Sequence, residues 1–164
     1  MNVGIITVSD RAFSGEYEDH GGPALQAEAD KRKWRVIADA VVPDDREKIK
    51  EVITAFEAQG CSLILTTGGT GITERDVTPE AVRDIMRVEI DGFGELMRMR
   101  SVEITPNAIL SRGLAAVVGN SLVITLPGKP KGAVECLEFV EGAIPHTVKS
   151  VSYTHLTLPT ICSV

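Results

Sequence analysis

Short apolar runs rich in β-branched residues recur along this chain, and amphipathic segments separate them. Three of these runs have the length and composition of buried strands: residues 3–8, 34–42 and 62–65. Between the second and third runs, apolar residues follow the i, i+3, i+4, i+7 spacing of one helix face: Ile49, Val52, Ile53 and Phe56. Gly60 follows where a glycine is expected after a helix C-terminus. Strands that alternate with helices predict the α/β class.

The second half of the chain continues this alternation and adds a hairpin. Helices are predicted over residues 21–33, 78–86, 95–101 and 132–139. For the helix at 78–86, Thr78 is the predicted N-cap and Pro79 fits the first helical position. The apolar runs 115–118 and 122–126 flank the turn signal Gly119-Asn120-Ser121. We therefore expect a mostly parallel sheet with one antiparallel strand.

The most informative segment is rich in glycine and follows the third predicted strand directly. It consists of three glycines and three threonines: Thr66, Thr67, Gly68, Gly69, Thr70 and Gly71. Glycine allows positive φ angles and a close approach of a ligand to the backbone, and consecutive N–H groups in such a turn form an anion-binding concavity. The segment therefore suggests a phosphate cradle, although a strand-to-turn connection that simply needs glycine explains it equally well when taken alone.

Composition narrows the classes of protein. The chain has 164 residues, which fits one domain, and 43% hydrophobic residues, enough for a substantial core. A net charge of −6 argues against a general nucleic-acid surface. No apolar run has the ~18 residues of a membrane span, and no leader pattern is present, so a cytoplasmic protein is expected. The few cysteines and histidines are scattered, which predicts neither a disulfide framework nor a zinc site.

Polar and glycine-rich segments follow four of the predicted strands. Because the carboxyl ends of parallel strands lie along one edge of a sheet, where ligands bind, we expect these segments to converge. The candidate substrate-binding residues, besides the six residues of the glycine-rich segment, are Ser9, Asp10, Arg11, Ser14, Pro127, Gly128, Lys129, Pro130 and Lys131. Asp44 follows the second strand, and Asp76 follows the glycine-rich segment.

The charged candidates each have two interpretations. Lys129 and Lys131 suit an anion but also suit a solvated loop, and Arg11 suits either a bidentate phosphate contact or a salt bridge to a neighbouring acid. Asp44 and Asp76 fit helix N-termini, and Asp45 could provide the cap in place of Asp44. A carboxylate beside a phosphate cradle repels the ligand unless a cation lies between them. We therefore predict Mg²⁺ here, since it typically takes one or two carboxylates together with substrate phosphates.

Several motifs at these positions, in the same order, resemble the MogA/MoaB-type molybdopterin adenylyltransferases. They are Thr7 to Arg11, Pro43 to Asp45, Thr66 to Gly71, Arg75 to Pro79, Gly92 to Arg98, Ala108 to Arg112 and Leu126 to Lys131. The resemblance extends from Asn2 to about Val148. It differs at Gly132, where many relatives have serine after the Pro-Gly-x-Pro-Lys segment.

The resemblance implies a three-layer α/β/α sandwich of the molybdopterin-binding type. It implies transfer of AMP from ATP to the terminal phosphate of molybdopterin, with release of pyrophosphate, in molybdenum cofactor biosynthesis. It assigns catalytic and metal roles to Asp44 and Asp76, and ligand binding to the Thr66–Gly71 and Pro127–Lys131 segments. The implied assembly is a homotrimer, with Mg²⁺ as cofactor and ATP as co-substrate, upstream of a molybdenum-insertion enzyme.

Alternatives stay open at the level of sequence. A non-catalytic molybdopterin-binding protein of the same pathway would share these motifs, although retention of both Asp44 and Asp76 favours the enzyme. Molybdenum insertion would require a much longer chain, and an unrelated phosphate-binding regulator would leave the Pro127–Lys131 segment unexplained. The pattern changes after Val151, so we expect a functional domain over residues 1–151 and a C-terminal tail over 152–164 that does not belong to the family.

Overall fold

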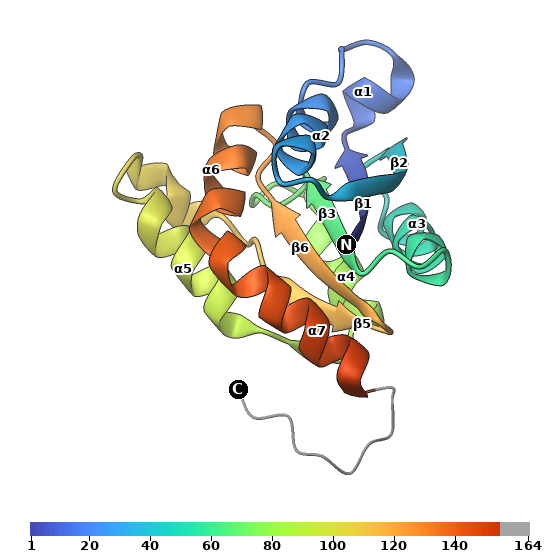
Figure 1. The fold of residues 1–164 in the computed structure, drawn as a ribbon. Helices are drawn as coiled ribbons and strands as arrows, with labels where there is room; N and C mark the ends of the chain where they lie inside the picture. The colour runs from blue at the N-terminus through green and yellow to red at the C-terminus, as the bar shows by residue number, and fades with distance from the viewer. Residues whose placement is uncertain (155–164) are drawn as a thin grey trace.

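A computed structural model describes residues 1–154, which form a six-stranded sheet between layers of helices (Figure 1). The strands are β1 (Asn2–Val8), β2 (Arg35–Val42), β3 (Leu63–Thr67), β4 (Val88–Glu89), β5 (Ala115–Val118) and β6 (Ser121–Leu126). Their order in the sheet is β2-β1-β3-β6-β5-β4. Parallel pairing joins β2, β1, β3 and β6, whereas β5 runs antiparallel to both β6 and β4. The predicted α/β class with one antiparallel strand is confirmed.

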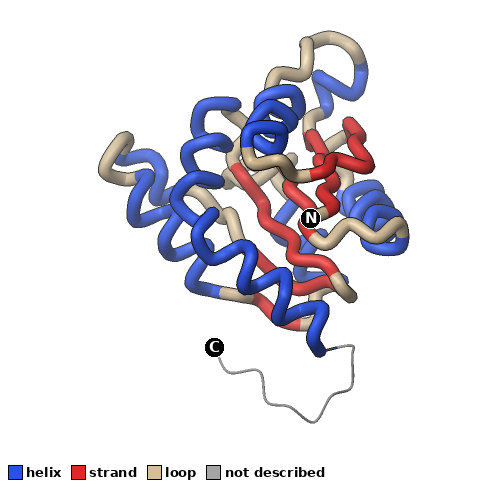
Figure 2. Tube along the Cα trace, viewed as in Figure 1, coloured by secondary structure: helices blue, strands red, loops and turns tan. Residues whose placement is uncertain are grey.

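Helices cover both faces of the sheet, as Figure 2 shows. The longer ones are α2 (Gly21–Lys31), α3 (Arg46–Ala58), α4 (Thr78–Ile85), α5 (Asp91–Ser101), α6 (Pro130–Val140) and α7 (Ile144–Thr154). Shorter helical segments are α1 (Asp10–Ser14), η1 (Pro106–Leu110) and η2 (Glu141–Ala143). One core joins the sheet to α2, α5, α6 and α7, and the second joins it to α3 and α4. The expected three-layer α/β/α arrangement is thus present.

The alternation of side chains along the central strands explains the two cores. In β3, Leu63 and Leu65 belong to the first core, and Ile64 belongs to the second. In β1 the same alternation places Ile5 in the first core and Ile6 in the second. Strands that are buried on both faces need continuous apolar runs, which is the pattern that the sequence showed.

The structure differs from the predicted elements at several ends. The third strand extends beyond Leu65 to Thr67, because its threonines pair with β6. The loop expected after Ser9 contains the short helix α1, for which Ser9 is the N-cap. The prediction that Thr78 caps α4 is wrong, since Val77 holds that position and the Thr78 hydroxyl donates to the Gly68 carbonyl at 3.0 Å.

Helix α7 and strand β4 were not predicted. In α7, Ile144 and Val151 are buried, and Val148 packs against the first core, to which Ile144 belongs. The i, i+4, i+7 spacing of these three residues is typical of one helix face and is already present in the sequence. Strand β4 has two residues, which is too short for a periodicity to be read.

The expected C-terminal tail, residues 152–164, lies mainly outside the described residues, and positions 152–154 form the end of α7. Within the described part of the chain, no helix has both the length and the hydropathy required to span a membrane.

Candidate active site

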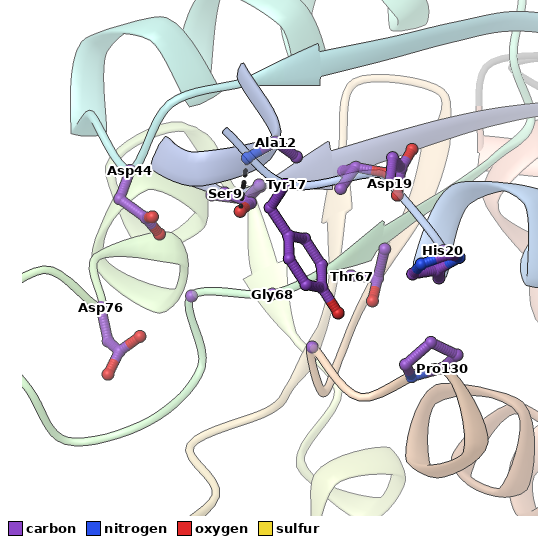
Figure 3. A pocket seen from close by; sticks show the side chains of 15 residues that line it. Ser9, Ala12, Tyr17, Asp19, His20, Asp44, Thr67, Gly68, Asp76 and Pro130 are labelled. Atoms are coloured by element: carbon purple, nitrogen blue, oxygen red, sulfur yellow. Dashed lines mark hydrogen bonds between the residues drawn. The ribbon is translucent and has the colours of Figure 1, made fainter. Parts of the chain in front are cut away.

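The loops that follow β1, β2, β3 and β6 meet at one edge of the sheet, as the topology requires (Figure 3). A cavity of about 230 Å³ lies among them. Thr7 and Ser9 line it after β1, and Asp44 lines it after β2. Gly68 and Gly128 bring in the loops after β3 and β6. The predicted convergence of these four strand ends is therefore observed.

The glycine-rich loop keeps its shape because two of its residues have conformations that only glycine adopts easily. Gly68 has φ 106° and Gly69 has φ 71°. A Cβ atom on Gly68 would collide with the Val8 carbonyl oxygen, and one on Gly69 would collide with the Thr78 hydroxyl. Backbone hydrogen bonds fix the loop further, from Gly68 N to the Leu126 carbonyl at 3.0 Å and from Thr78 N to the Gly69 carbonyl at 3.1 Å.

Arg112 holds the far end of this loop. Its guanidinium donates to the Gly71 carbonyl and the Asp76 carbonyl, each at 2.8 Å, and its amide N donates to the Thr70 carbonyl at 2.8 Å. The same side chain forms an ion pair with Glu80 at 2.5 Å, and this hydrogen-bonded pair lowers the pKa of Glu80. Arg112 therefore fixes the backbone around Asp76. In the sequence, Arg112 lies within one of the motifs that carry the family resemblance, and nothing there indicates its role.

Asp44 and Asp76 approach the glycine-rich loop at two nearby points. Asp44 Oδ1 lies 3.2 Å from the position that a Cβ on Gly69 would take, and Asp76 Oδ2 lies 2.8 Å from the corresponding point on Gly71. In Figure 3 the two carboxylates lie on the same side of the cavity, which both of them line. Neither is a helix cap, because Asp45 caps α3 by accepting from Lys48 N at 3.0 Å and Val77 occupies the cap position of α4.

The environment of Asp44 opposes its negative charge. Burial raises the pKa of Asp44, and the charges of Asp10 and Asp76 raise it further. A hydrogen bond from the Asp10 backbone and the positive charge of Arg75 act in the opposite direction. Asp76 is held differently, since its Oδ2 accepts from Thr73 N at 2.9 Å and from the Thr73 hydroxyl at 2.8 Å. A cation bound between these two carboxylates would relieve the repulsion between their negative charges.

A Mg²⁺ ion at this site would take only one or two of its ligands from the protein. Residues 1–154 contain no group of three or more His, Cys, Asp or Glu side chains placed to hold a metal ion. Asp44 and Asp76 nevertheless supply the one or two carboxylates that Mg²⁺ usually takes, with phosphate and water oxygens completing its shell. The donors present therefore fit a metal that arrives with a phosphorylated substrate, and they do not fit a fully protein-bound ion.

A second cleft of about 650 Å³ adjoins the first cavity. It lies between the glycine-rich loop, α5, η1 and α6, and its lining is largely apolar, with Met97, Ile104 and Leu110 among the contributors. Gly69, Asp76 and Gly128 line both cavities. The two cavities therefore meet at the glycine-rich loop, beside a carboxylate.

Most of the predicted site residues line one of these cavities. Beyond those already placed, Thr67 and Pro130 line the smaller one, and Thr70, Gly71, Pro127 and Lys129 line the larger one. Five predicted residues line neither, namely Asp10, Arg11, Ser14, Thr66 and Lys131.

Each of these five has a different environment. The Asp10 carboxylate accepts from Arg75 at 2.9 and 3.0 Å. Arg11 is exposed and lies 4.0 Å from Glu16, which is the salt-bridge alternative for this residue. The Ser14 hydroxyl donates to the Arg11 carbonyl at 3.1 Å. Thr66 is fully buried, and Lys131 is exposed.

Several residues that line the smaller cavity were not predicted as site residues, and three of them carry a ring or a carboxylate. Tyr17, Asp19 and His20 all line it, and Figure 3 shows the Tyr17 ring lying across it. Asp19 accepts from the Thr7 hydroxyl at 2.9 Å and from Gly22 N at 3.0 Å, and Tyr17 and His20 are in edge-to-face contact with centroids 5.8 Å apart. Asp19 three residues before Gly22 was the available signal, since an aspartate at this spacing commonly accepts from a backbone amide at a helix start.

Comparisons with known proteins agree with this geometry. Residues 4–146 match the model of a family described as a probable molybdopterin binding domain. The chain is 44% identical over 151 residues to molybdopterin adenylyltransferase of Helicobacter pylori strain J99, covering 90% of this chain and 86% of that protein. It is 38% identical over 152 residues to molybdopterin adenylyltransferase of Escherichia coli K12, covering 87% and 75% of the two chains. Among solved structures, the molybdopterin biosynthesis enzyme MoaB of Thermus thermophilus superposes with a TM-score of 0.87 at 44% identity, over 93% of this chain and 96% of that one.

Proposed function

This chain belongs to the molybdopterin-binding domain family, and we propose that it transfers AMP from ATP to the terminal phosphate of molybdopterin, releasing pyrophosphate. The reaction belongs to molybdenum cofactor biosynthesis. The observation that carries this proposal is the junction of two cavities at Gly69, Asp76 and Gly128.

The two cavities suit two different substrates. The larger one has a mostly apolar lining and a volume of about 650 Å³, which suits a flat heterocycle such as a pterin. The smaller one, of about 230 Å³, is lined by the glycine-rich loop, by Ser9 and by the Tyr17 ring, which suits a nucleotide. Substrates bound in this way would bring their phosphates together at the glycine-rich loop.

The chemistry needs positioning more than it needs a base. The nucleophile is a phosphate oxygen of molybdopterin, which is already anionic at neutral pH. A bond forms from this oxygen to the α-phosphorus of ATP, and the bond from the α-phosphorus to the bridging oxygen of pyrophosphate breaks. The residues around the junction therefore act by alignment and by electrostatic stabilisation.

Three groups of this chain supply that stabilisation. The glycine-rich loop offers backbone N–H groups in a conformation fixed by Gly68 and Gly69. Lys129 lines the larger cleft as a cation without an ion-pair partner among the described residues. We assign Asp44 and Asp76 the role of holding Mg²⁺, which when bound would neutralise the phosphate oxygens and orient them.

The biological setting is also a proposal, based on the family resemblance. We propose a homotrimer that acts in the cytoplasm and passes its adenylylated product to a molybdenum-insertion enzyme. We further propose that residues 1–151 carry the activity. Sedimentation equilibrium of the purified chain tests the trimer.

A direct assay tests the proposed reaction. Purified protein is incubated with molybdopterin and [α-³²P]ATP, with and without Mg²⁺, and the products are separated. We expect label on molybdopterin and stoichiometric pyrophosphate only when both substrates and Mg²⁺ are present. Tight molybdopterin binding without transfer of label would instead identify a binding protein of the same pathway. Formation of ADP would exclude adenylyl transfer.

A further inference from the structure

The larger cleft contains a carboxylate for which the reaction described above has no use. Glu135 lies in the second turn of α6, is partly buried and lines this cleft. Lys131 lies four residues earlier on the same helix, a spacing at which ion pairs often form, but no ion pair joins the two. Among residues 1–154 the Glu135 carboxylate has neither a hydrogen bond nor an ion pair.

In the described part of the chain, the side chains near Glu135 do not pair with its negative charge. Cys136, next to it on α6, is 5% exposed and lies with its Sγ 3.5 Å from the Ser101 hydroxyl. Burial raises the pKa of the Cys136 thiol, and the negative charge of Glu135 contributes to this rise. Met97 also lines this part of the cleft. Glu135 lines this largely apolar cleft without a partner among the described residues, so a ligand that fills the cleft would have to supply hydrogen-bond donors to its carboxylate.

The other ionised groups of the cleft have other positions or partners. Arg98 donates to the Gly113 carbonyl at 2.6 Å, so its charge is already engaged. Asp76 and Lys129 lie at the end of the cleft near the glycine-rich loop. Glu135 is six positions beyond Lys129 along α6, a rise of about 9 Å. The cleft therefore carries a cation near the phosphate junction and an unpaired carboxylate farther along the helix.

The pterin ring carries the complementary donors at the correct end. Its N3–H and 2-amino groups point in the same direction. Its phosphate-bearing side chain is attached on the opposite side of the bicyclic ring system. Two parallel N–H donors match the two oxygens of a carboxylate. Such a pair of hydrogen bonds is bidentate and charge-assisted, which makes it both strong and specific in geometry. We propose that Glu135 binds the N3–H and 2-amino edge of the pterin and thereby sets both the specificity for pterin and the orientation of the substrate in the cleft. This inference rests on the molybdopterin-binding part of the proposed function.

A pair of ring systems that differ at one atom tests the proposal. In 6-hydroxymethyllumazine an oxygen replaces the 2-amino group of 6-hydroxymethylpterin, so a carboxylate would meet an acceptor where it needs a donor. A glutamine side chain presents one acceptor and one donor, which matches the lumazine edge instead. Both compounds are fluorescent, so their dissociation constants are measured directly at pH 7, without ATP.

We expect wild-type protein to prefer the pterin over the lumazine by about 10- to 100-fold, the range for the loss of one hydrogen bond to a charged group. Glu135→Gln should move that ratio at least about tenfold toward the lumazine. Glu138→Gln, which changes an exposed glutamate on the same helix, should leave the ratio unchanged. An equal ratio in wild type and Glu135→Gln would overturn the proposal, as would the absence of pterin binding to wild type.

The AMP-transfer assay on the same proteins separates this inference from the proposed function. Loss of pterin preference in Glu135→Gln without AMP transfer by wild type would support the role of Glu135 and refute the activity. AMP transfer by wild type with an unchanged pterin preference in Glu135→Gln would refute only the role of Glu135.

Discussion

Asp10 and Asp44 hold each other through two reciprocal hydrogen bonds. The amide N of Asp10 donates to Asp44 Oδ2 at 3.0 Å, and the amide N of Asp44 donates to Asp10 Oδ1 at 2.9 Å. Arg75 then clamps Asp10 from the other side, with Nε and Nη2 at 2.9 and 3.0 Å from its carboxylate oxygens. Three loops are thereby joined, and the Asp44 carboxylate is oriented toward Gly69. We therefore expect Asp10 to act as a positioning residue for Asp44, while its direct contact with substrate stays a prediction.

Replacing Asp10 should therefore affect turnover more than substrate affinity. Asp10→Ala removes the acceptor for Asp44 N and releases Arg75, so we expect kcat to fall about tenfold or more, with KM for both substrates changed less than about threefold. Asp10→Asn retains an acceptor for Asp44 N and should keep most of the turnover. Steady-state kinetics of both variants provide the measurement. A large rise in KM with an unchanged kcat would return Asp10 to the substrate-binding residues.

Asp76→Asn should reduce turnover by about 10²–10³-fold, the usual effect of losing one electrostatic contact in an active site. The asparagine can still accept from Thr73, so the loop should keep its shape and molybdopterin affinity should stay within a few-fold. Single-turnover rates at saturating Mg²⁺, together with direct molybdopterin binding, separate these effects. Near-full activity of this variant would mean that Asp76 has only a local structural role.

Neutralising Asp44 should stabilise the protein while abolishing its activity. Burial and the neighbouring charges of Asp10 and Asp76 raise the folded-state pKa of Asp44 above its unfolded value. The folded state is therefore penalised as pH rises through these two pKa values, and the full penalty is present above the folded one. Asp44→Asn removes this penalty, so its melting temperature should exceed that of wild type at pH 7.

The pH dependence provides the control for this prediction. At pH 3, below the ordinary aspartate pKa of about 3.9, the melting temperatures of wild type and Asp44→Asn should converge. Asp45→Asn keeps the helix cap at the adjacent position and should not reproduce the effect. A melting temperature below that of wild type at pH 7 would show that the hydrogen bonds of the Asp44 carboxylate outweigh its burial.

Arg112→Ala should destabilise the fold, because three acceptors that hold the glycine-rich loop and α4 together lose their donor. We expect a loss of about 2 kcal/mol, which corresponds to a drop of about 4–8 °C in melting temperature for a domain of this size. Arg112→Lys cannot reproduce the planar guanidinium group and its several donors, so it should recover little of the lost stability. Arg83→Ala, which breaks an exposed pair with Glu89, is the matched control and should cost less than about 1 kcal/mol. Equal melting temperatures for the two alanine variants would refute the role of Arg112.

The sequence predicted the features that depend on local chemistry. Apolar runs identified the central strands, and parallel topology then brought Asp44, Gly69 and Gly128 to one cavity. Contacts between distant segments were not predictable. Nothing near Arg75 indicates that it pairs with Asp10, 65 positions away, or that Arg112 holds Gly71, 41 positions away. Such partners are chosen by the packed fold, and a polar residue in a loop gives the same local signal whether it is solvated or paired.

The same limit explains the errors at helix ends. Thr78 has the residue type of an N-cap, yet its hydroxyl is used to bind the Gly68 carbonyl. The helix predicted over residues 95–101 begins earlier, at Asp91, so that Gly92 and Gly94 both lie within α5. A Cβ on Gly94 would lie 2.8 Å from the Gly113 carbonyl oxygen. The close packing of α5 against the segment that precedes β5 therefore requires this glycine. Tertiary contact thus overrides the helix propensity of glycine.

Gly132 occupies a position where many relatives are expected to have serine. It lies in the first turn of α6 and lines the larger cleft. A Cβ at Gly132 would meet only Pro127, at 3.5 and 3.7 Å, which is ordinary van der Waals contact. Serine is the better helix former by about 0.5 kcal/mol, so Gly132→Ser should raise the melting temperature by about 1–2 °C. Its hydroxyl would face the cleft near the phosphate junction, so KM for molybdopterin should stay the same or fall.

Gly94→Ser is the control, because its Cβ would press on the Gly113 carbonyl, and it should lower the melting temperature instead. Differential scanning fluorimetry and molybdopterin kinetics on the two variants test this, and destabilisation by Gly132→Ser would show that the backbone at this position needs glycine after all.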